Sequence, residues 1–197
     1  MKFDDALDYI RNPYVTEEIY GKEQRILHIE LNNDPESVTL EKAKEFFKYS
    51  KLLNLVTIAS GDDRVSNIAD DALSAFDLAF TTSSTQCEAL IQVSDVDEAI
   101  SGIEASVISN PESSIMLVQL LRQRAYLDVA KGLVSESTVY ATLQGGPEFQ
   151  TWISERDALP EDNSSASTIL CNRDGSVLTI SLNRPDKANA FSVAMRD

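Results

Sequence analysis

A histidine and a glutamate are the first candidates for acid–base chemistry in this chain of 197 residues. His28 is the only histidine, and it lies between Leu27 and Ile29 in a run typical of a β-strand. A general base needs a cleft and an orienting partner, and the neighbouring residues indicate neither, so we expect a surface or edge-strand histidine. Glu136 shares one side of an expected helix with apolar residues, where burial would raise its pKa. We expect it to have a structural role, paired with an arginine or a backbone donor.

Two other clusters suggest ion binding but have simpler explanations. Four aspartates crowd one loop: Asp62, Asp63, Asp70 and Asp71. Their spacing differs from that of calcium loops, which place ligands at alternating positions around a glycine. Gly145-Gly146 could hold an anion, but the following Pro147 indicates the end of one helix and the start of another. With one histidine and no Cys/His cluster in the sequence, we predict neither a metal site nor a catalytic residue.

Apolar patterns predict an α/β fold for the N-terminal part of the chain. Leu55 to Ser60 has the composition of a buried strand. Thr39 to Leu53 has the spacing of an amphipathic helix, with Thr39 as its N-cap. A second helix is predicted to begin at Asn110-Pro111, with Asn110 as N-cap and an apolar face that continues through Leu121.

Two more helices are expected before a polar segment. Tyr126 to Leu143 continues the helical spacing until Gly145-Gly146 breaks it. A short helix with Phe149 and Trp152 then ends near Arg156. The residues that follow are polar, include a proline and have neither apolar period, which is typical of an exposed linker.

The C-terminal segment repeats a pattern found near the N-terminus. Ser176 to Asn183 matches Arg25 to Asn32 as an apolar strand, and both copies are followed by a proline. Thr168 to Cys171 is expected to pair with Val177 to Leu182 around a tight Asp-Gly turn. Because two strands alone are marginally stable in water, we expect this piece to pack on the N-terminal domain or to be loosely ordered. Four later residues have helical spacing: Ala190, Phe191, Ala194 and Met195.

These residues resemble the start of the enoyl-CoA hydratase/isomerase (crotonase) family. In that family a strand ending in Leu-Asn-Arg-Pro, here Leu182 to Pro185, leads to an Asn-Ala element and a helix. The run from Gly61 to Asp70 also looks like the family loop Gly-Asp-x-x-Phe-Ser-x-Gly-x-Asp, whose N–H groups help to hold the thioester oxygen. Val65 and Ile68 stand where the family has an aromatic residue and a glycine. A β-branched residue disfavours the backbone angles that glycine permits, so we predict a degenerate loop.

The resemblance implies a particular domain organisation. Residues 1–156 would form a shortened, degenerate crotonase-like domain, a ClpP/crotonase strand-turn-helix spiral. Residues 157–168 would be a linker, and residues 169–197 the first strands of a second, truncated crotonase copy. We expect the catalytic segments of that copy to lie outside this chain.

The resemblance also implies where coenzyme A would lie. The turn formed by Lys187, Ala188, Asn189 and Ala190 would border the coenzyme A pocket, with Lys187 available to a phosphate. A structural alternative remains open, in which Asn189 caps the helix and Lys187 is merely exposed to solvent. Both descriptions can hold together.

Two functions follow as expectations. The intact protein would act on acyl-CoA thioesters, with hydration of 2-enoyl-CoA as the expected reaction, isomerisation as an open alternative and the coenzyme A thioester as substrate rather than cofactor. The chain alone would be inactive. Alternatively, residues 1–156 are a non-catalytic interaction or scaffolding module that docks on a crotonase domain or an oligomer, and a homo-oligomer stays open.

Composition limits the partners and the compartment. The whole chain has a net charge of −15. Residues 170–197 have a net charge of +1, so the net negative charge lies entirely in the N-terminal part. An acidic surface repels phosphate backbones, so we expect no nucleic acid partner. The sequence has no apolar span of membrane length and no signal peptide, so no membrane association is expected. Cys87 and Cys171 lie far apart, which favours a reduced, cytoplasmic setting.

Overall fold

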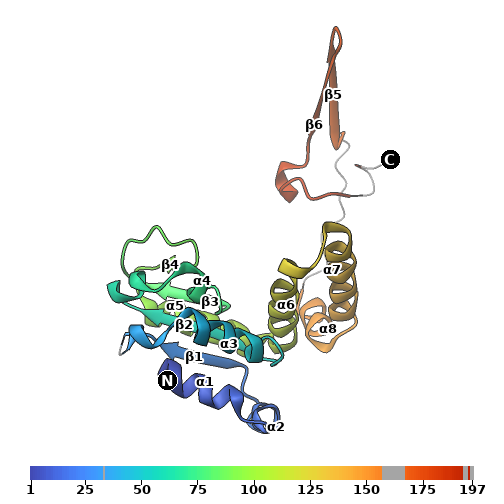
Figure 1. Ribbon diagram of the computed structural model, residues 1–197. Helices are drawn as coiled ribbons and strands as arrows, with labels where there is room; N and C mark the ends of the chain where they lie inside the picture. The colour runs from blue at the N-terminus through green and yellow to red at the C-terminus, as the bar shows by residue number, and fades with distance from the viewer. Residues whose placement is uncertain (33, 157–166, 193–194, 196–197) are drawn as a thin grey trace. The chain divides into compact units, whose positions relative to one another are not determined.

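The computed structural model describes the chain except for residues 33, 157–166, 193–194 and 196–197. It divides into two compact units, Met1–Glu155 and Arg156–Asp197. The first unit is a layered α/β structure, and the second contains a β-hairpin (Figure 1).

A parallel sheet forms the centre of the first unit. Its four strands lie in chain order: β1 (Ile26–Glu30), β2 (Val56–Gly61), β3 (Leu78–Thr81) and β4 (Ile91–Gln92). All six residues of β2 are buried, whereas β1 lies at an edge. Burial on both faces explains why β2 has no alternating pattern in the sequence.

Helices from the first half of the chain pack on one face of the sheet. They are α1 (Phe3–Arg11), α2 (Val15–Gly21), α3 (Leu40–Ser50) and the short α4 (Asp70–Leu73). The rings of Phe3, Phe46 and Phe76 meet here with centroids 5.2–6.0 Å apart. Short 3-10 turns cover Pro35–Ser37 and Asp63–Asn67.

The opposite face of the sheet packs against α5 (Val96–Ser109) and α6 (Pro111–Gln123). Ile100 and Val107 of α5 and Ile115 of α6 bury their side chains with those of Ile58 and Phe80. A 3-10 turn over Arg124–Tyr126 leads to α7 (Val129–Gln144), and α8 (Pro147–Ser154) follows. These two helices extend the layer beyond the sheet, with α7 beside α6 (Figure 1).

A side chain from α8 holds the start of α6. The carboxylate of Glu148 accepts hydrogen bonds from the backbone N–H groups of Glu112 and Ser113 and from the Ser113 hydroxyl. Burial raises the pKa of Glu148, but these donors outweigh it and leave the pKa below its usual value. An anion at a helix N-terminus satisfies N–H groups that have no partner within the helix.

A buried ion pair joins α6 to the sheet. The guanidinium of Arg122 binds both carboxylate oxygens of Asp77, at 2.8 and 2.6 Å. The two side chains are only 5% and 13% exposed. One carboxylate oxygen of Asp77 also accepts bonds from the backbone N–H and the hydroxyl of Thr57 in β2. The pair therefore links the entrances of two strands to a helix of the covering layer.

The second unit is built on an antiparallel hairpin of β5 (Ile169–Asp174) and β6 (Val177–Leu182). Ile169 pairs with Leu182 and Asp174 with Val177. Gly175, in the two-residue turn, has φ 57°, a left-handed angle that glycine adopts without steric cost. Alternation along this register puts a mainly apolar set on one face: Ile169, Cys171, Arg173, Leu178, Ile180 and Leu182. A 3-10 turn over Pro185–Lys187 follows.

The predicted α/β class is confirmed by the parallel sheet and its helices. The expected helix at Thr39 and the strand at Leu55 appear as α3 and β2, and the Thr39 hydroxyl accepts the predicted bond from the Lys42 N–H at 3.3 Å. The crotonase-like spiral, by contrast, stays a prediction.

Several details differ from the sequence predictions. The side chain of Asn110 makes no capping bond to α6, and the N–H groups of Glu112 and Ser113 that it would cap bind Glu148 instead. Leu121, expected on the buried face, is 52% exposed. Glu136 is exposed rather than at a buried boundary, since α7 buries none of its residues. Ala190 to Ser192 are not helical, and most of the remaining predicted helix lies outside the described residues.

Candidate functional site

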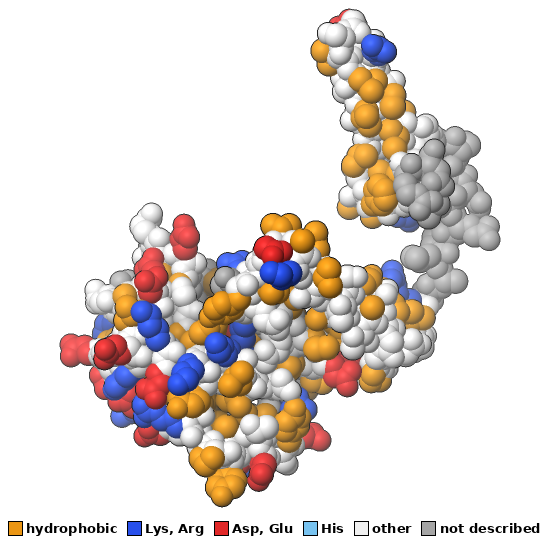
Figure 2. Space-filling model, turned by 45° about the vertical axis from the view of Figure 1, so that its right-hand side comes forward, with side chains coloured by type: hydrophobic (Ala, Val, Ile, Leu, Met, Phe, Trp, Pro, Cys, Tyr) orange, Lys and Arg blue, Asp and Glu red, His pale blue; other side chains and the backbone are white. Residues whose placement is uncertain are grey.

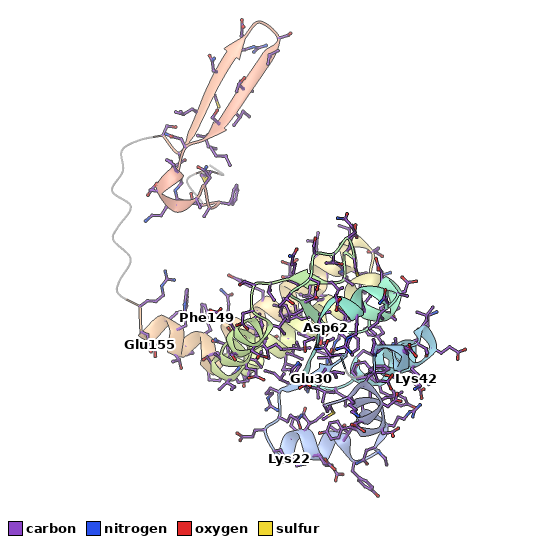
Figure 3. All side chains as sticks on the ribbon, turned by 90° about the vertical axis from the view of Figure 1, so that its left-hand side faces the viewer. Lys22, Glu30, Lys42, Asp62, Phe149 and Glu155 are labelled. Carbon is purple, nitrogen blue, oxygen red and sulfur yellow. The ribbon has the colours of Figure 1, made fainter. Side chains whose placement is uncertain are left out.

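A polar cleft lies at the carboxyl end of the parallel sheet. Glu30 and Asp62, both labelled in Figure 3, line this cleft. The cleft has a volume of about 520 Å³ and is closed on another side by the loop before α5. Its polar lining comes from several segments: His28, Glu30, Asn32, Ser60, Asp62, Thr82, Ser94, Asp95 and Asp97. Ligand sites of open α/β sheets are commonly found beyond the carboxyl ends of the strands.

His28 and Ser60 meet inside this cleft. The Nε2 atom of His28 lies 2.7 Å from the Ser60 hydroxyl, and the ring is half-buried. Burial, together with the nearby N-terminal ammonium group, lowers the pKa of His28 below its ordinary value. That ammonium donates to the His28 carbonyl at 2.9 Å. His28 does lie on an edge strand as expected, but the cleft and the serine partner were missed in the sequence, where 32 residues separate the two side chains.

A serine hydroxyl beside a neutral imidazole supplies the nucleophile and the general base of a nucleophilic site. The remaining requirement is a set of N–H donors aimed at the oxygen on which negative charge develops. The loop that leaves β2 would be the nearest source of such donors. Its geometry decides whether this loop can supply them.

The loop after Gly61 uses its N–H groups internally. The Arg64 N–H bonds to the Asp62 carboxylate at 3.1 Å, the Val65 N–H to the Asp62 carbonyl at 3.3 Å, and the Ile68 N–H to the Val65 carbonyl at 3.0 Å. The Asp62 N–H donates to the Asn32 side chain at 2.6 Å. Four donors of the family-like loop are thus engaged within the protein.

The two positions of this loop that differ from the crotonase-family pattern pack in the hydrophobic core. The side chains of Val65 and Ile68 are buried, at 1% and 6% exposure. Ile68 has φ −77° and ψ 136°, an extended backbone that suits a β-branched residue. A Cβ at Gly61 would lie 2.1 Å from a Val65 methyl group, so the glycine is needed for close approach. The loop is packed as a structural element.

Asp62 should titrate well below the ordinary pKa of an aspartate. Hydrogen bonds from the Arg64 side chain, and then from its backbone, lower the pKa of Asp62 from 3.8 to about 2. We expect a carboxyl NMR titration to show a midpoint near that value, and the Arg64→Gln variant to bring it back toward 3.8. Because the folded-state pKa is the lower one, this pair stabilises the fold above about pH 4 and ceases to do so as the pH falls toward 2.

An unchanged midpoint for Asp62 in Arg64→Gln would contradict that assignment. The matched control is Arg11→Gln, which removes an exposed arginine from the pairs with Asp8 and Glu45 elsewhere on the surface. It should leave the Asp62 midpoint unchanged.

The turn predicted to border a coenzyme A pocket lies in the second unit. Ala188 and Asn189 both have left-handed backbone angles, with φ 49° and 55°. The Asn189 side chain accepts a bond from the Arg184 N–H at 2.8 Å, so it closes the turn rather than capping a following helix. The Lys187 ammonium lies 3.9 Å from Asp186 and is partly exposed. Lys187 to Ala190 thus form one compact turn with a lysine at its surface.

The helices α6 to α8 expose many large apolar side chains. No residue of α7 is buried, and Val129, Leu133 and Val134 are 80%, 61% and 67% exposed. Exposed apolar side chains also occur on the neighbouring helices, and we call the whole set the α6–α8 apolar face: Leu117, Leu121, Val129, Leu133, Val134, Tyr140, Trp152 and Ile153. Figure 2 shows hydrophobic side chains gathered over parts of the first unit and along the hairpin.

Comparisons with known proteins add no relative to this description. The chain matches no protein-family model, no curated protein and no solved structure. Among the described residues, no helix is both long and apolar enough to cross a membrane. Within the same residues, no three acidic, cysteine or histidine side chains gather as a metal site would require.

Proposed function

We propose that this chain is part of an enoyl-CoA hydratase/isomerase-type protein that acts on acyl-CoA thioesters. In this proposal residues 1–156 are a non-catalytic module that docks on a crotonase-type domain. The α6–α8 apolar face is the observation that carries the docking role. A concentration of large exposed apolar side chains on neighbouring helices is typical of interaction sites. The 16-residue helix α7, which buries none of its residues, gains little stability from packing within its own unit.

The loop from Gly61 to Ile68 supports the non-catalytic role. An oxyanion site needs N–H groups that are free to point at the substrate. In this loop the N–H groups of Arg64, Val65 and Ile68 bond to other atoms of the loop. The same positions bury apolar side chains, which favours a fold that is retained for its contacts.

The turn at Lys187 supports the link to acyl-CoA. It follows the strand β6 and the Leu182 to Pro185 motif in the order that the family resemblance implies. An exposed ammonium group beside a tight backbone turn fits a phosphate of coenzyme A. We propose Lys187, Ala188, Asn189 and Ala190 as the border of that pocket in the intact protein, where hydration of 2-enoyl-CoA is the expected reaction.

The purified chain should not hydrate an enoyl thioester. Incubation with crotonyl-CoA should leave the absorbance of the conjugated thioester unchanged, because the proposed catalytic segments are not in this sequence. A complete hydratase domain, assayed in parallel, is the positive control. Rapid loss of the absorbance with residues 1–197 alone would overturn the non-catalytic assignment.

Docking should depend on α7. We expect the chain to co-elute with a separately produced, complete crotonase-type domain in size-exclusion chromatography. Leu133→Asp should weaken the association at least about tenfold, since charge in an apolar contact is strongly disfavoured. The matched control is Ile108→Asp on α5, where the side chain is 74% exposed and outside the α6–α8 apolar face. No association, or equal effects of both variants, would count against the docking role.

A further inference from the structure

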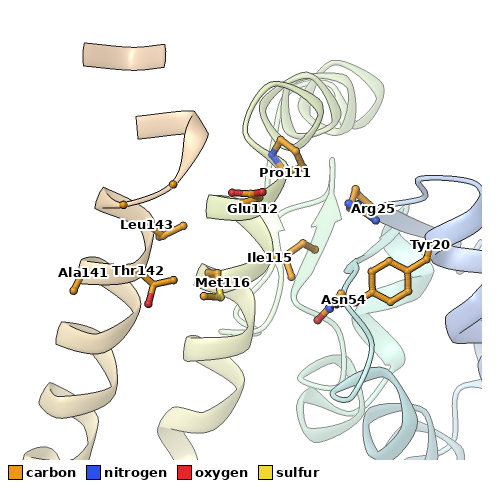
Figure 4. A pocket seen from close by; sticks show the side chains of 12 residues that line it. Tyr20, Arg25, Asn54, Pro111, Glu112, Ile115, Met116, Ala141, Thr142 and Leu143 are labelled. Atoms are coloured by element: carbon orange, nitrogen blue, oxygen red, sulfur yellow. Dashed lines mark hydrogen bonds between the residues drawn. The ribbon is translucent and has the colours of Figure 1, made fainter. Parts of the chain in front are cut away.

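A second hollow of the first unit lies at the opposite end of the strands from the His28 cleft. It has a volume of about 670 Å³, within the range of small-molecule sites. Figure 4 shows Ile115 at its centre, with α7 residues on one side and Tyr20, Arg25 and Asn54 on the other. We call it the Arg25 groove. Its lining comes from three helices and three connections: Tyr20, Arg25, Asn54, Pro111, Glu112, Ile115, Met116, Ala141, Thr142, Leu143, Gly145 and Gly146.

The middle of the Arg25 groove is apolar. Pro111, Ile115 and Met116 of α6 face it together with Leu143 of α7. Ile115 is only 9% exposed and is fixed in the core beneath the sheet. Beside Leu143 the wall is bare backbone, because Gly145 and Gly146 carry no side chain. An apolar chain or ring laid here would be removed from water on two sides, which favours binding in proportion to the apolar surface buried.

One wall of the groove carries a cation without a carboxylate partner. The half-buried guanidinium of Arg25 has one hydrogen bond, a long one of 3.5 Å to the Gln24 carbonyl. No described carboxylate comes within 4.0 Å of it, although the sequence contains 32 acidic residues. By contrast, Arg11, Arg64 and Arg122 each bind an aspartate or glutamate. A planar guanidinium beside an apolar floor is suited to a carboxylate head group.

We propose that the Arg25 groove binds a small amphipathic monocarboxylate, with its head on Arg25 and its apolar body over Ile115 and Met116. This site belongs to the first unit and does not depend on the function proposed above. Glu112 also lines the groove. Its exposed carboxylate repels additional negative charge, so a single carboxylate is preferred over a phosphate dianion.

Three probes separate the head group from the apolar body. Isothermal titration of the full chain with decanoate, below the concentration at which it forms micelles, should show one saturable site. Decanol offers the same body without charge, and inorganic phosphate offers charge without the body. Both should bind at least about tenfold more weakly, decanol because it loses the charge-assisted hydrogen bond to Arg25 and phosphate because it buries no apolar surface. Binding of decanol as tight as that of decanoate would overturn the role of Arg25.

Substitutions then locate the site. Arg25→Gln should weaken decanoate binding at least about tenfold without affecting the fold, because Arg25 joins the sheet through its carbonyl, which the Val56 N–H binds. Glu112→Gln should strengthen binding about two- to fivefold by removing a like charge. Ala141→Trp places a ring in the groove from the exposed side of α7 and should abolish binding. The charge-matched control, Arg124→Gln, changes an exposed arginine outside the groove and should have no effect.

Two results would overturn the proposal. One is wild-type affinity for decanoate in both Arg25→Gln and Ala141→Trp, which would place the ligand elsewhere. The other is an absence of decanoate binding by the wild-type chain. Heteronuclear NMR gives an independent reading, since decanoate should shift the amide signals of Gly145 and Gly146 and leave those of His28 and Ser60 unchanged.

Discussion

Replacing Asp77 with alanine should lower the free energy of unfolding by about 3–5 kcal/mol, because it leaves a buried guanidinium without its counter-charge. Arg122 is 5% exposed in its side chain, and it binds both oxygens of Asp77. Urea unfolding followed by circular dichroism measures the loss. The cost of stranding a buried charge exceeds the net contribution of the intact pair, since forming the pair also removes two ions from water.

The geometry around Arg122 supports the large value. Its guanidinium also donates to the carbonyls of Ser50, Leu53 and Leu55, at 2.9–3.2 Å. These carbonyls belong to the end of α3 and to the connection into β2, so the arginine cannot move to water without breaking several bonds. Loss of Asp77 would also leave the Thr57 N–H and hydroxyl without their common acceptor. An unsatisfied buried donor costs about 1–3 kcal/mol.

A surface pair gives the matched control. Arg11 binds Glu45 through two nitrogens, at 3.1 and 2.7 Å, but both side chains are more than a third exposed. Glu45→Ala should therefore cost only a small fraction of the loss expected for Asp77→Ala, because solvent screens this exposed pair. Similar losses for Asp77→Ala and Glu45→Ala would contradict the role assigned to the buried pair. The helices α1 to α8 all lie in the first unit. The helical circular dichroism signal that is lost on unfolding of Asp77→Ala should therefore come mainly from this unit.

Local signals explain which elements could be predicted from the sequence. Thr39 is followed by apolar residues at helical spacing, and its hydroxyl caps α3. Leu55 to Ser60 is mostly apolar, and β2 is buried on both faces. Pro147 after two glycines marks the start of α8. In each case the determining contacts lie within a few residues of one another, so a pattern of residue types contains most of the information.

Long-range pairings explain what was missed. Asp77 and Arg122 are 45 residues apart, and His28 and Ser60 are 32 apart. They meet only because the strands pair in one register and α6 crosses their entrances, which no local pattern encodes. Helix α1, which the sequence analysis did not predict, is a different case. Phe3, Leu7 and Ile10 have the spacing of an apolar helix face, so the signal for α1 was present.

The amphipathic pattern of α7 shows the limit of periodicity. Leu133, Tyr140 and Leu143 recur on one side of the helix. This spacing predicts an apolar face, but it does not predict which element packs on that face. In the structure Leu133 and Tyr140 are 61% and 63% exposed, and only Leu143 turns partly inward beside the Arg25 groove. The pattern of apolar and polar residues predicts which face of a helix is apolar. Whether that face is buried depends on whether another element packs against it. The same distinction applies to Glu136, which was expected at the boundary of the apolar side and is exposed.

Replacing Phe46 with alanine should destabilise the first unit by about 3–5 kcal/mol. Phe46 is fully buried on α3, and its ring lies 5.7 Å from that of Phe3 and 5.2 Å from that of Phe76, between centroids. The substitution removes apolar surface and leaves a cavity bounded by two large rings. Thermal and urea unfolding of the full chain, compared with the wild type, would measure the loss.

The conservative variant Phe46→Leu tests whether the cavity causes that loss. Phe3 reaches this cluster from α1 and Phe76 from the turn before β3, so three distant segments define the space, and they cannot collapse into it without moving the sheet. Leucine fills most of the volume and should cost less than about half as much as alanine. Tyr14→Ala is the control for aromatic loss without burial, since Tyr14 is 64% exposed, and it should change stability by no more than about 0.5 kcal/mol. Equal costs for leucine and alanine at position 46 would instead indicate that ring-to-ring contacts, rather than filled volume, hold α1, α3 and the sheet together.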